Sequence, residues 1–394
     1  MKRLGLIALV LMLAGGMVAF AGGAREADTA VAEDNLERSL EVDISGLRSA
    51  DGQTLLPELS SKEVPSRPDN PRSLPETDPM HWYDMEYLGW GVEEKINIPD
   101  SPADGAIGKR VIAIINGDHP YLTAYSTGMQ KIADAYSMDL TVLSPNWDLA
   151  EQNQMLDEAI NERPDMIILV PLDARVAIQQ VRRVNRAGVP IILSNMLPEE
   201  EAMQYAIAWT GPDDWGQFRE MARVWADELG RSGGVAYIRH APGGSPYFAR
   251  TYGPITELAE YAPDIETLDM QAPGFEAEAT MQVVSDWLTR FGDRLTGIGL
   301  ADDSAQAIGT IEALRRAGRE DVLVIAAGNS KVGMDMVKDG DLLAITYQSA
   351  EADGAVALKT AVDWFNGLDV DPVLYIPKQV ITQENVEDFM PAQW

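Results

Sequence analysis

The feature that most constrains the fold is a regular alternation of short apolar runs and amphipathic stretches, which begins after Lys109 and continues through most of the remaining sequence. The apolar runs, such as residues 166–171, are short and continuous, as is typical of buried parallel strands. Between them, as at residues 121–136, apolar residues recur on one helical face. Repeated strand–helix alternation predicts an α/β fold with parallel sheets and right-handed crossovers.

The alternation also predicts where the elements lie. Strands are expected at residues 110–116, 140–143, 166–171, 190–194, 206–209, 234–239, 265–270, 296–300, 322–327 and 343–347. Helices are expected at residues 121–136, 149–161, 174–187, 213–229, 246–261, 276–291, 304–317, 332–338 and 352–366. Because about ten strands are more than one twisted sheet comfortably holds, we expect two sheets in two lobes.

Residues 1–21 have the pattern of a signal peptide. Lys2 and Arg3 precede an apolar run, and Ala19-Phe20-Ala21 matches the small-x-small cleavage pattern. The alternative is a membrane anchor, but glycines interrupt the run, which is shorter than the ~20 residues that a membrane-spanning helix needs. The sequence has no cysteine, which excludes a lipid-modified cysteine and disulfides. We therefore expect a periplasmic protein without a lipid anchor or direct membrane insertion.

The charge of the sequence restricts the classes of partner that the protein can bind. The formal net charge is −31, with 31 Lys and Arg residues against 62 Asp and Glu residues. Nucleic acid and anionic membrane surfaces are therefore poor partners, since Lys and Arg supply the attraction to phosphate. We predict no nucleic-acid partner.

Residues 22–108 differ from the rest of the chain. They are acidic, rich in Ser and Pro and poor in apolar periodicity, so they are expected to form a flexible leader with a short helix around residues 35–40. Within the leader, residues 80–99 contain the aromatic residues Trp82, Tyr83, Tyr87 and Trp90. We interpret this segment as an aromatic strap that docks onto the lobes. Contact with a partner, or a lid over a ligand, are the alternatives.

Polar and aromatic side chains follow the predicted strands, at the sheet edge where ligands bind in open parallel sheets. Asp173, Ser245 and Asp303 also fit helix N-caps, and His119 and His240 also fit exposed loops. No metal-ligand spacing and no nucleophile–base pair stands among these residues. We therefore predict no catalytic residue, no metal and no cofactor.

Several stretches of the sequence, taken together, indicate a protein family more specifically than any one of them does. They are "INGDHPYLTAYSTGMQKIAD", "LDEAINERPDMIILVPLDA", "VNRAGVPIILSN", "FARTYG", "GIGLADDSAQAIGTIEALRRAGREDVLVIAAG" and "VKDGDLLAITYQSAEADG". In their order, the sequence from about Lys109 onward resembles the periplasmic sugar-binding proteins of ABC importers, in the ribose-binding branch. The leader lies outside the resemblance.

The resemblance implies the type I periplasmic binding protein fold: two doubly wound parallel-sheet lobes joined by three crossing strands. The crossings fall near Thr210-Gly211, Gln348 and Lys378. The N-terminal lobe is then residues 109–210 plus 349–377, and the C-terminal lobe is residues 211–348 plus 378–394.

The resemblance also implies a ligand site between the lobes. Two charged family residues fall on Ser194 and Asn195, and the usual aspartate falls on Gly328, beside Asn329. These departures leave the fold and transport role in place but remove ribose as the implied ligand. The implied ligand-binding residues are His119, Tyr121, Leu122, Asn195, Arg250, Phe275, Asp302, Asn329 and Gln348.

Such residues suit a sugar or polyol, because aromatic rings pack on C–H faces while polar side chains pair with hydroxyls. We predict that the protein captures a carbohydrate or polyol as a monomer and delivers it to an ABC permease in the inner membrane. One alternative is a sensor of the same fold that signals to a membrane receptor or kinase. Another is a secreted hydrolase that uses Asp302, Asp303 or His240.

Overall fold

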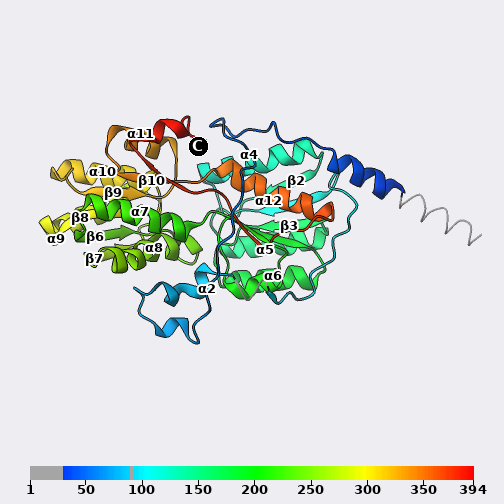
Figure 1. Ribbon diagram of the computed structural model, residues 1–394, viewed down its shortest axis with the longest axis horizontal. Coiled ribbons are helices and arrows are strands. Elements are labelled where there is room, and N and C mark those ends of the chain that lie inside the picture. The colour runs from blue at the N-terminus through cyan, green and yellow to red at the C-terminus, as the bar shows by residue number, and fades with distance from the viewer. Residues whose placement is uncertain (1–29, 89–92) are drawn as a thin grey trace, which may run out of the picture.

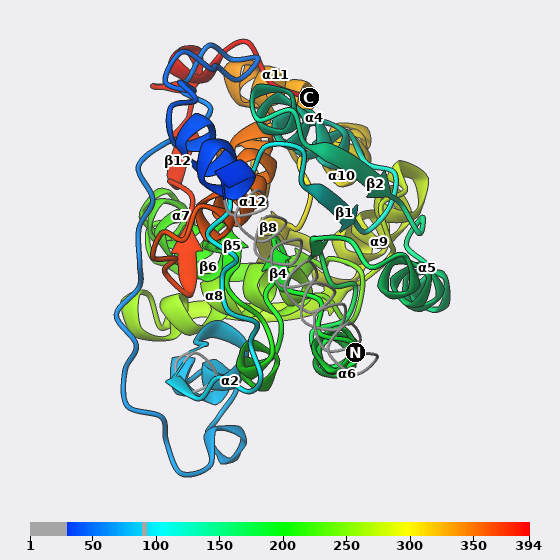
Figure 2. The same cartoon turned by 90° about the vertical axis from the view of Figure 1, so that its right-hand side faces the viewer.

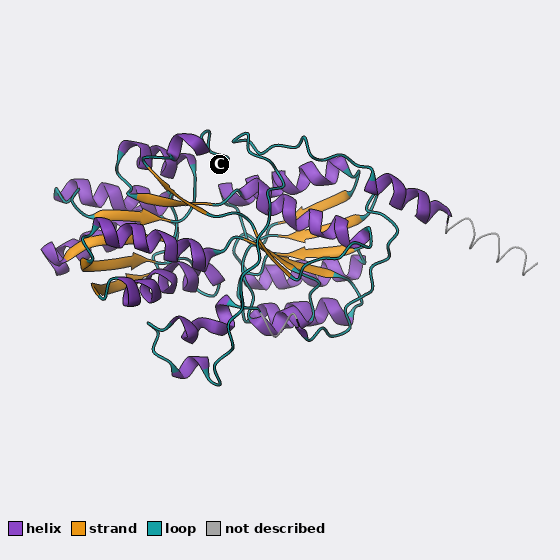
Figure 3. Cartoon of the chain, in the orientation of Figure 1, coloured by secondary structure: helices purple, strands orange, loops and turns teal. Residues whose placement is uncertain are grey.

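Two six-stranded sheets, each with helices on both faces, form two lobes (Figures 1 and 3). The computed structural model describes residues 30–88 and 93–394. The predicted signal peptide and Trp90 of the aromatic strap lie outside the described residues. Within the described residues, no helix combines the length and the apolar character needed to cross a membrane.

The first sheet has the strand order β11-β5-β4-β3-β1-β2, and all its strand pairs are parallel. Its strands are β1 (Arg110–Ile114), β2 (Asp139–Leu143), β3 (Met166–Leu169), β4 (Ile191–Ser194), β5 (Trp209–Gly211) and β11 (Val373–Tyr375). The covering helices are α4 (Pro120–Ala135), α5 (Leu149–Glu162), α6 (Val176–Arg186) and α12 (Ala350–Phe365).

Alternate strand residues of the first sheet enter two different cores, as expected of a sheet buried on both faces. Val111 and Ala113 pack with residues of α4 and α12. Ile112 and Ile114 pack with residues of α5 and α6 on the opposite face.

The second sheet has the strand order β12-β10-β9-β8-β6-β7. Its strands are β6 (Ser232–Ile238), β7 (Asp264–Gln271), β8 (Leu295–Leu300), β9 (Leu323–Ala326), β10 (Ala344–Tyr347) and β12 (Gln379–Thr382). The helices of this lobe are α7 (Asp214–Glu228), α8 (Ser245–Tyr261), α9 (Ala277–Phe291), α10 (Ala305–Ala317) and α11 (Lys331–Asp339). The edge strand β12 runs antiparallel to β10, so this sheet is parallel except at one edge.

The chain passes from the first sheet to the second after β5, returns between β10 and α12, and passes to the second sheet again between β11 and β12. Short 3₁₀ helices complete the lobes, at Glu200–Gln204, Gly292–Arg294 and Val386–Phe389. The lobes are therefore joined by three short segments of the chain.

The leader was predicted to be flexible, but several of its described residues are packed against the two lobes (Figures 1 and 2). Residues 30–40 form a helix, and short helical segments lie at Pro71–Ser73, Pro79–Trp82 and Tyr83–Glu86. The leader has few apolar side chains, but the lobes supply the surface that covers them. Leu55, Trp82, Met85 and Leu88 are consequently buried.

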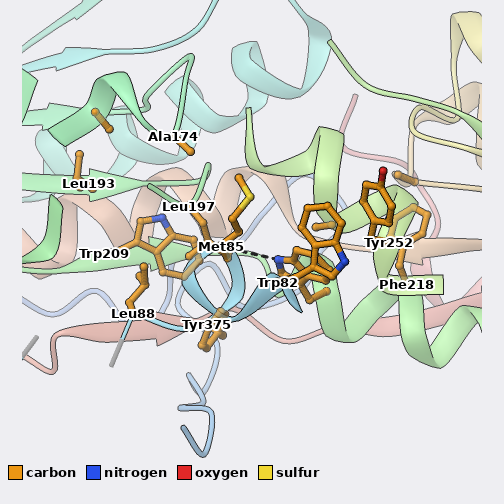
Figure 4. Close-up of a cluster of buried hydrophobic side chains, with 14 of the residues drawn as sticks. Trp82, Met85, Leu88, Ala174, Leu193, Leu197, Trp209, Phe218, Tyr252 and Tyr375 are labelled. Carbon is orange, nitrogen blue, oxygen red and sulfur yellow. Dashed lines mark hydrogen bonds between the residues drawn. The ribbon is translucent and has the colours of Figure 1, made fainter. Parts of the chain in front are cut away.

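Trp82, Met85 and Leu88 of the aromatic strap lie between residues of the two lobes (Figure 4). The Trp82 ring stacks on Tyr252 of α8 with 4.0 Å between ring centroids. The Trp215 indole donates a hydrogen bond to the Met85 carbonyl at 3.3 Å, while Met85 and Leu88 belong to the same core as Trp209 of β5. The described part of the strap therefore docks onto the lobes, and its aromatic side chains contribute large buried areas there.

Candidate functional site

A cavity of about 60 Å³ lies between the lobes, at the carboxyl ends of their strands. In open α/β sheets this edge is where ligands bind. Its walls come from both lobes and from the last residue of the sequence. The lining residues are Asn116, His119, Tyr121, Leu122, Trp147, Asn195, Met196, His240, Pro246, Arg250, Phe275, Ala301, Asp302, Ala327, Gly328, Gln348 and Trp394.

The structure brings eight of the predicted ligand-binding residues to this cavity: His119, Tyr121, Leu122, Asn195, Arg250, Phe275, Asp302 and Gln348. Asn329 differs, since it is not part of the lining. It is buried beneath, and its side-chain oxygen accepts a hydrogen bond from the Gln348 backbone N–H at 3.4 Å. Asn329 therefore supports Gln348, while Gly328, on which the usual aspartate of the family falls, lines the cavity.

The wall of the first lobe is built on the start of α4. His119 is the N-cap, and its Nδ1 accepts a hydrogen bond from the Tyr121 backbone N–H at 3.2 Å, while Pro120 occupies the first helical turn. This local structure gives a physical reason for the sequence His119-Pro120-Tyr121 after the buried strand β1. The cap orients the helix so that His119 and Tyr121 both face the cavity.

A buried carboxylate that sequence reasoning did not single out holds this wall in place. Asp353 of α12 accepts hydrogen bonds on Oδ2 from the Tyr121 hydroxyl at 2.9 Å and from the Asn195 amide at 2.6 Å. Burial raises the pKa of Asp353 to about 7, although these two hydrogen bonds act in the opposite direction. The available signal was an acidic residue on a helix whose buried positions are otherwise mostly apolar.

The wall of the second lobe carries the charged groups. The Arg250 guanidinium is fixed by hydrogen bonds to Asp214 at 3.0 Å and to the Ala301 carbonyl at 2.8 Å. Asp302 accepts hydrogen bonds from Ser304, and its carboxylate lies 3.7 Å from His119 Nε2 across the cleft. Burial acts to raise the pKa of Asp302, but His119 and Ser304 outweigh it and lower that pKa.

A third wall is aromatic. Phe275 was among the predicted ligand-binding residues and His240 among the residues that follow strands, whereas Trp147 was not predicted. Phe275 lies 4.9 Å from the His240 ring and 5.9 Å from the Trp147 ring, measured between centroids. Burial and the charge of Arg250 lower the pKa of His240 to about 3, so its imidazole is neutral. Trp147 fits closely against Gly117, where an added Cβ would lie 2.4 Å from the indole ring. Glycine at position 117 therefore makes room for this wall.

The two lobes touch around the cavity. The Leu197 backbone N–H donates to the Ser245 hydroxyl at 2.8 Å, and the Ala174 backbone N–H donates to the Gly243 carbonyl at 3.1 Å. Each of these contacts joins the first lobe to the second. The described arrangement is therefore one in which the lobes are closed on the cavity.

Asp302 and Asp303, two of the residues considered for a hydrolase, face different parts of the structure. Asp303 is turned to the start of α11, where it accepts a hydrogen bond from the Ser330 backbone N–H at 2.8 Å. Asp302, its neighbour, faces the cavity. Among the described residues, no cluster of three or more His, Asp or Glu side chains has the geometry of a metal site.

Known proteins with sequences similar to this chain include two that are named for sugar or polyol binding. The chain is 28% identical over 281 residues to the xylitol-binding protein of Mycolicibacterium smegmatis, in an alignment that covers 71% of this chain and 78% of that protein. It is 24% identical over 268 residues to the ribose import binding protein of Bacillus subtilis, with 68% and 85% covered.

Similar solved structures include an ABC transporter solute-binding protein from Bacillus halodurans with bound myo-inositol. Its TM-score is 0.68 at 26% identity, and the alignment covers 73% of this chain and 99% of that one. The family described as the periplasmic binding protein domain matches residues 110–369. These findings confirm the fold and the family expected from the sequence: the chain belongs to the periplasmic binding protein family.

Proposed function

We propose that this protein captures a neutral sugar or polyol between its lobes and delivers it to the permease of an ABC importer. The observation that carries the proposal is a pair of buried acceptors in the cavity lining. Asn116 Oδ1 and Gln348 Oε1 are buried and have no hydrogen-bond partner among the described residues. Hydroxyl groups of a ligand can donate to both, which removes the cost of leaving them unpaired.

Charge in the lining supports an uncharged ligand. Arg250 is already paired with Asp214, and Asp302 faces His119 across the cleft. A charged ligand would therefore enter a site whose ionic groups already have partners, at the cost of its own desolvation. A polyhydroxy compound avoids that cost, and its C–H faces can pack on rings such as Phe275. The names of the related xylitol- and ribose-binding proteins agree with this ligand class.

Location and mode of delivery follow from the same proposal. Export would be directed by residues 1–21, and the protein would act in the periplasm as a monomer. Ligand contacts from both lobes would favour the closed form by their differential affinity, and closure would be the state that the permease recognises. This role requires binding without turnover of the bound compound.

Thermal unfolding in the presence of candidate ligands tests the proposal. We expect xylitol, D-ribose, myo-inositol or D-allose to raise the melting temperature, while glutamate and lysine leave it unchanged. At a ligand concentration of 100 times Kd, binding to the folded state adds about 2.7 kcal/mol to the free energy of unfolding. The proposal is wrong if no sugar or polyol in a broad panel stabilises the protein and a charged ligand class does.

A further inference from the structure

The last residue of the sequence lies in the ligand cleft. Trp394 lines the cavity together with His119 and Tyr121. Its ring meets both of them edge to face, with centroids 5.5 Å from His119 and 5.6 Å from Tyr121. The chain terminus accordingly lies where the two lobes meet, beside α4 and α11 (Figures 1 and 2). The stretch that matches the family ends at residue 369, so Trp394 is outside it.

Trp394 contacts both lobes. Its carbonyl oxygen accepts a hydrogen bond from the Lys331 backbone N–H at 2.7 Å, at the first residue of α11. An added Cβ at Gly328 would lie 3.2 Å from the Trp394 ring, so the ring packs closely on that glycine. The ring therefore lies between Gly328 of the second lobe and Tyr121 of the first.

Two segments far apart in the sequence hold Trp394 in this position. The side chain of the neighbouring Gln393 donates a hydrogen bond to Asp51 of the leader at 2.6 Å. The Gln393 side-chain oxygen accepts one from the Glu351 backbone N–H at 3.0 Å. The leader is itself fastened there, since the Ala50 backbone N–H donates to the Glu351 carboxylate at 3.2 Å.

The indole nitrogen of Trp394 is buried and has no hydrogen-bond partner in the described part of the chain. Buried indole N–H groups normally donate a hydrogen bond, so this one is suited to a hydroxyl acceptor in the cleft. An indole ring also offers a flat apolar face to the C–H groups of a sugar or polyol.

We propose that Trp394 is a specificity-determining residue of the carbohydrate site, and that Asp51 of the leader positions it through Gln393. This inference rests on the proposed function. In it, the Trp394 ring packs on the bound compound and its N–H donates to one hydroxyl, while the hydrogen bond between Gln393 and Asp51 holds the ring in place.

Calorimetric titration of the full chain with xylitol, D-ribose, myo-inositol and D-allose tests the inference. Trp394→Phe keeps an aromatic face and loses the N–H, so it should weaken binding about tenfold. Trp394→Ala loses both and should weaken binding about 100-fold, with a changed order of preference among the four compounds. Trp364→Phe is the control, because Trp364 packs against Phe365 on α12 and does not line the cavity; its affinities should be unchanged.

The role of Asp51 is tested by a double-mutant cycle. Asp51→Ala should weaken binding several-fold in the native background and should have no effect on affinity in the Trp394→Ala background, because its action passes through Trp394. Equal effects in both backgrounds would show that Asp51 acts independently of Trp394, and would overturn the positioning role.

Other outcomes separate this inference from the proposed function. If the native protein binds one of the compounds and Trp394→Ala binds it equally well, only the inference about Trp394 is wrong. Tighter binding by Trp394→Ala would show that the ring obstructs the cleft, and would also overturn it. If the native protein binds none of the four compounds or any other sugar or polyol, the proposed function fails and the inference fails with it.

Discussion

Asp353 shows how one buried side chain can link segments of the first lobe that lie far apart in the sequence. It lies on α12, yet its carboxylate accepts hydrogen bonds from Tyr121 after β1 and from Asn195 after β4. Its second oxygen is buried and has no partner in the described structure. Both donors line the cavity, so Asp353 holds two side chains of that wall in place.

The raised pKa of Asp353 makes stability depend on pH. In the unfolded chain this carboxyl ionises near 3.8, whereas in the folded protein it holds its proton to about 7. The folded state therefore binds more protons between these values, and the Asp353 contribution to the free energy of unfolding falls as pH rises from about 4 to 7. Asp353→Asn keeps an oxygen acceptor for Tyr121 and Asn195 but does not titrate.

We expect the free energy of unfolding of the native protein, relative to that of Asp353→Asn, to fall between pH 4.5 and 7, by at most about 1.4 kcal/mol per pH unit. Urea unfolding at several pH values measures this difference. Asp286→Asn serves as the control, because Asp286 is an exposed residue of α9. A difference between the native protein and Asp353→Asn that stays constant over this interval would contradict the account.

At the scale of elements, the contact between α4 and α12 supports the same wall. The helices approach closely at two glycines. An added Cβ at Gly128 would lie 1.8 Å from the Glu351 carbonyl oxygen, and one at Gly354 would lie 1.9 Å from the Tyr125 carbonyl oxygen. Backbone atoms cannot move aside as a flexible side chain does, so a larger residue at either position must separate the helices.

Gly354→Ala should therefore lower the free energy of unfolding by about 1–3 kcal/mol or more, as overpacking does in other cores. It should also weaken binding of whichever sugar or polyol stabilises the native protein, because the neighbouring Asp353 moves with α12. Gly46→Ala is the matched control, since no atom lies within 4 Å of its added Cβ, and its effect should stay within about 0.5 kcal/mol. Unchanged stability of Gly354→Ala would show that the helices are not in close contact.

At the scale of elements, most helices and strands could be predicted from the sequence. Each predicted helix and strand after Lys109 was found, with ends displaced by a few residues, because periodic apolar patterns of that length are specific. The strands β11 and β12 were missed. They are only three and four residues long and lie at sheet edges. They become strands because they pair with β5 and β10, which lie far from them in the sequence.

The candidate site was predictable where it follows strand ends and less so elsewhere. His119, Asn195 and Asp302 lie in the segments that follow β1, β4 and β8, and the position of these strands in the sheets places them at the cavity. Asp353 reaches the site from beneath, and Trp394 reaches it from the end of the sequence. Tertiary packing brings both of them there. The local sequence signals only that Asp353 is an acidic residue on a mostly apolar helix, and does not show that it reaches the site.

At the scale of the whole molecule, the leader is attached to segments that connect the two lobes. Lys62 of the leader donates to Asp213 at 2.6 Å, and Lys378, between β11 and β12, donates to the same carboxylate at 2.7 Å. Although burial acts to raise it, the pKa of Asp213 is lowered to about 2 by these two ammonium groups. Asp213 follows β5, where the chain first leaves the first sheet. The leader thus contacts the segment after β5 directly and is linked through Asp213 to the segment between β11 and β12.

Closure on a bound ligand is the central claim, and small-angle X-ray scattering of the full chain tests it most directly. The radius of gyration should fall, and the scattering profile should change, when the protein is saturated with the sugar or polyol that stabilises it most. Scattering profiles that superimpose with and without that compound, at a concentration where calorimetry shows the site filled, would contradict the claim.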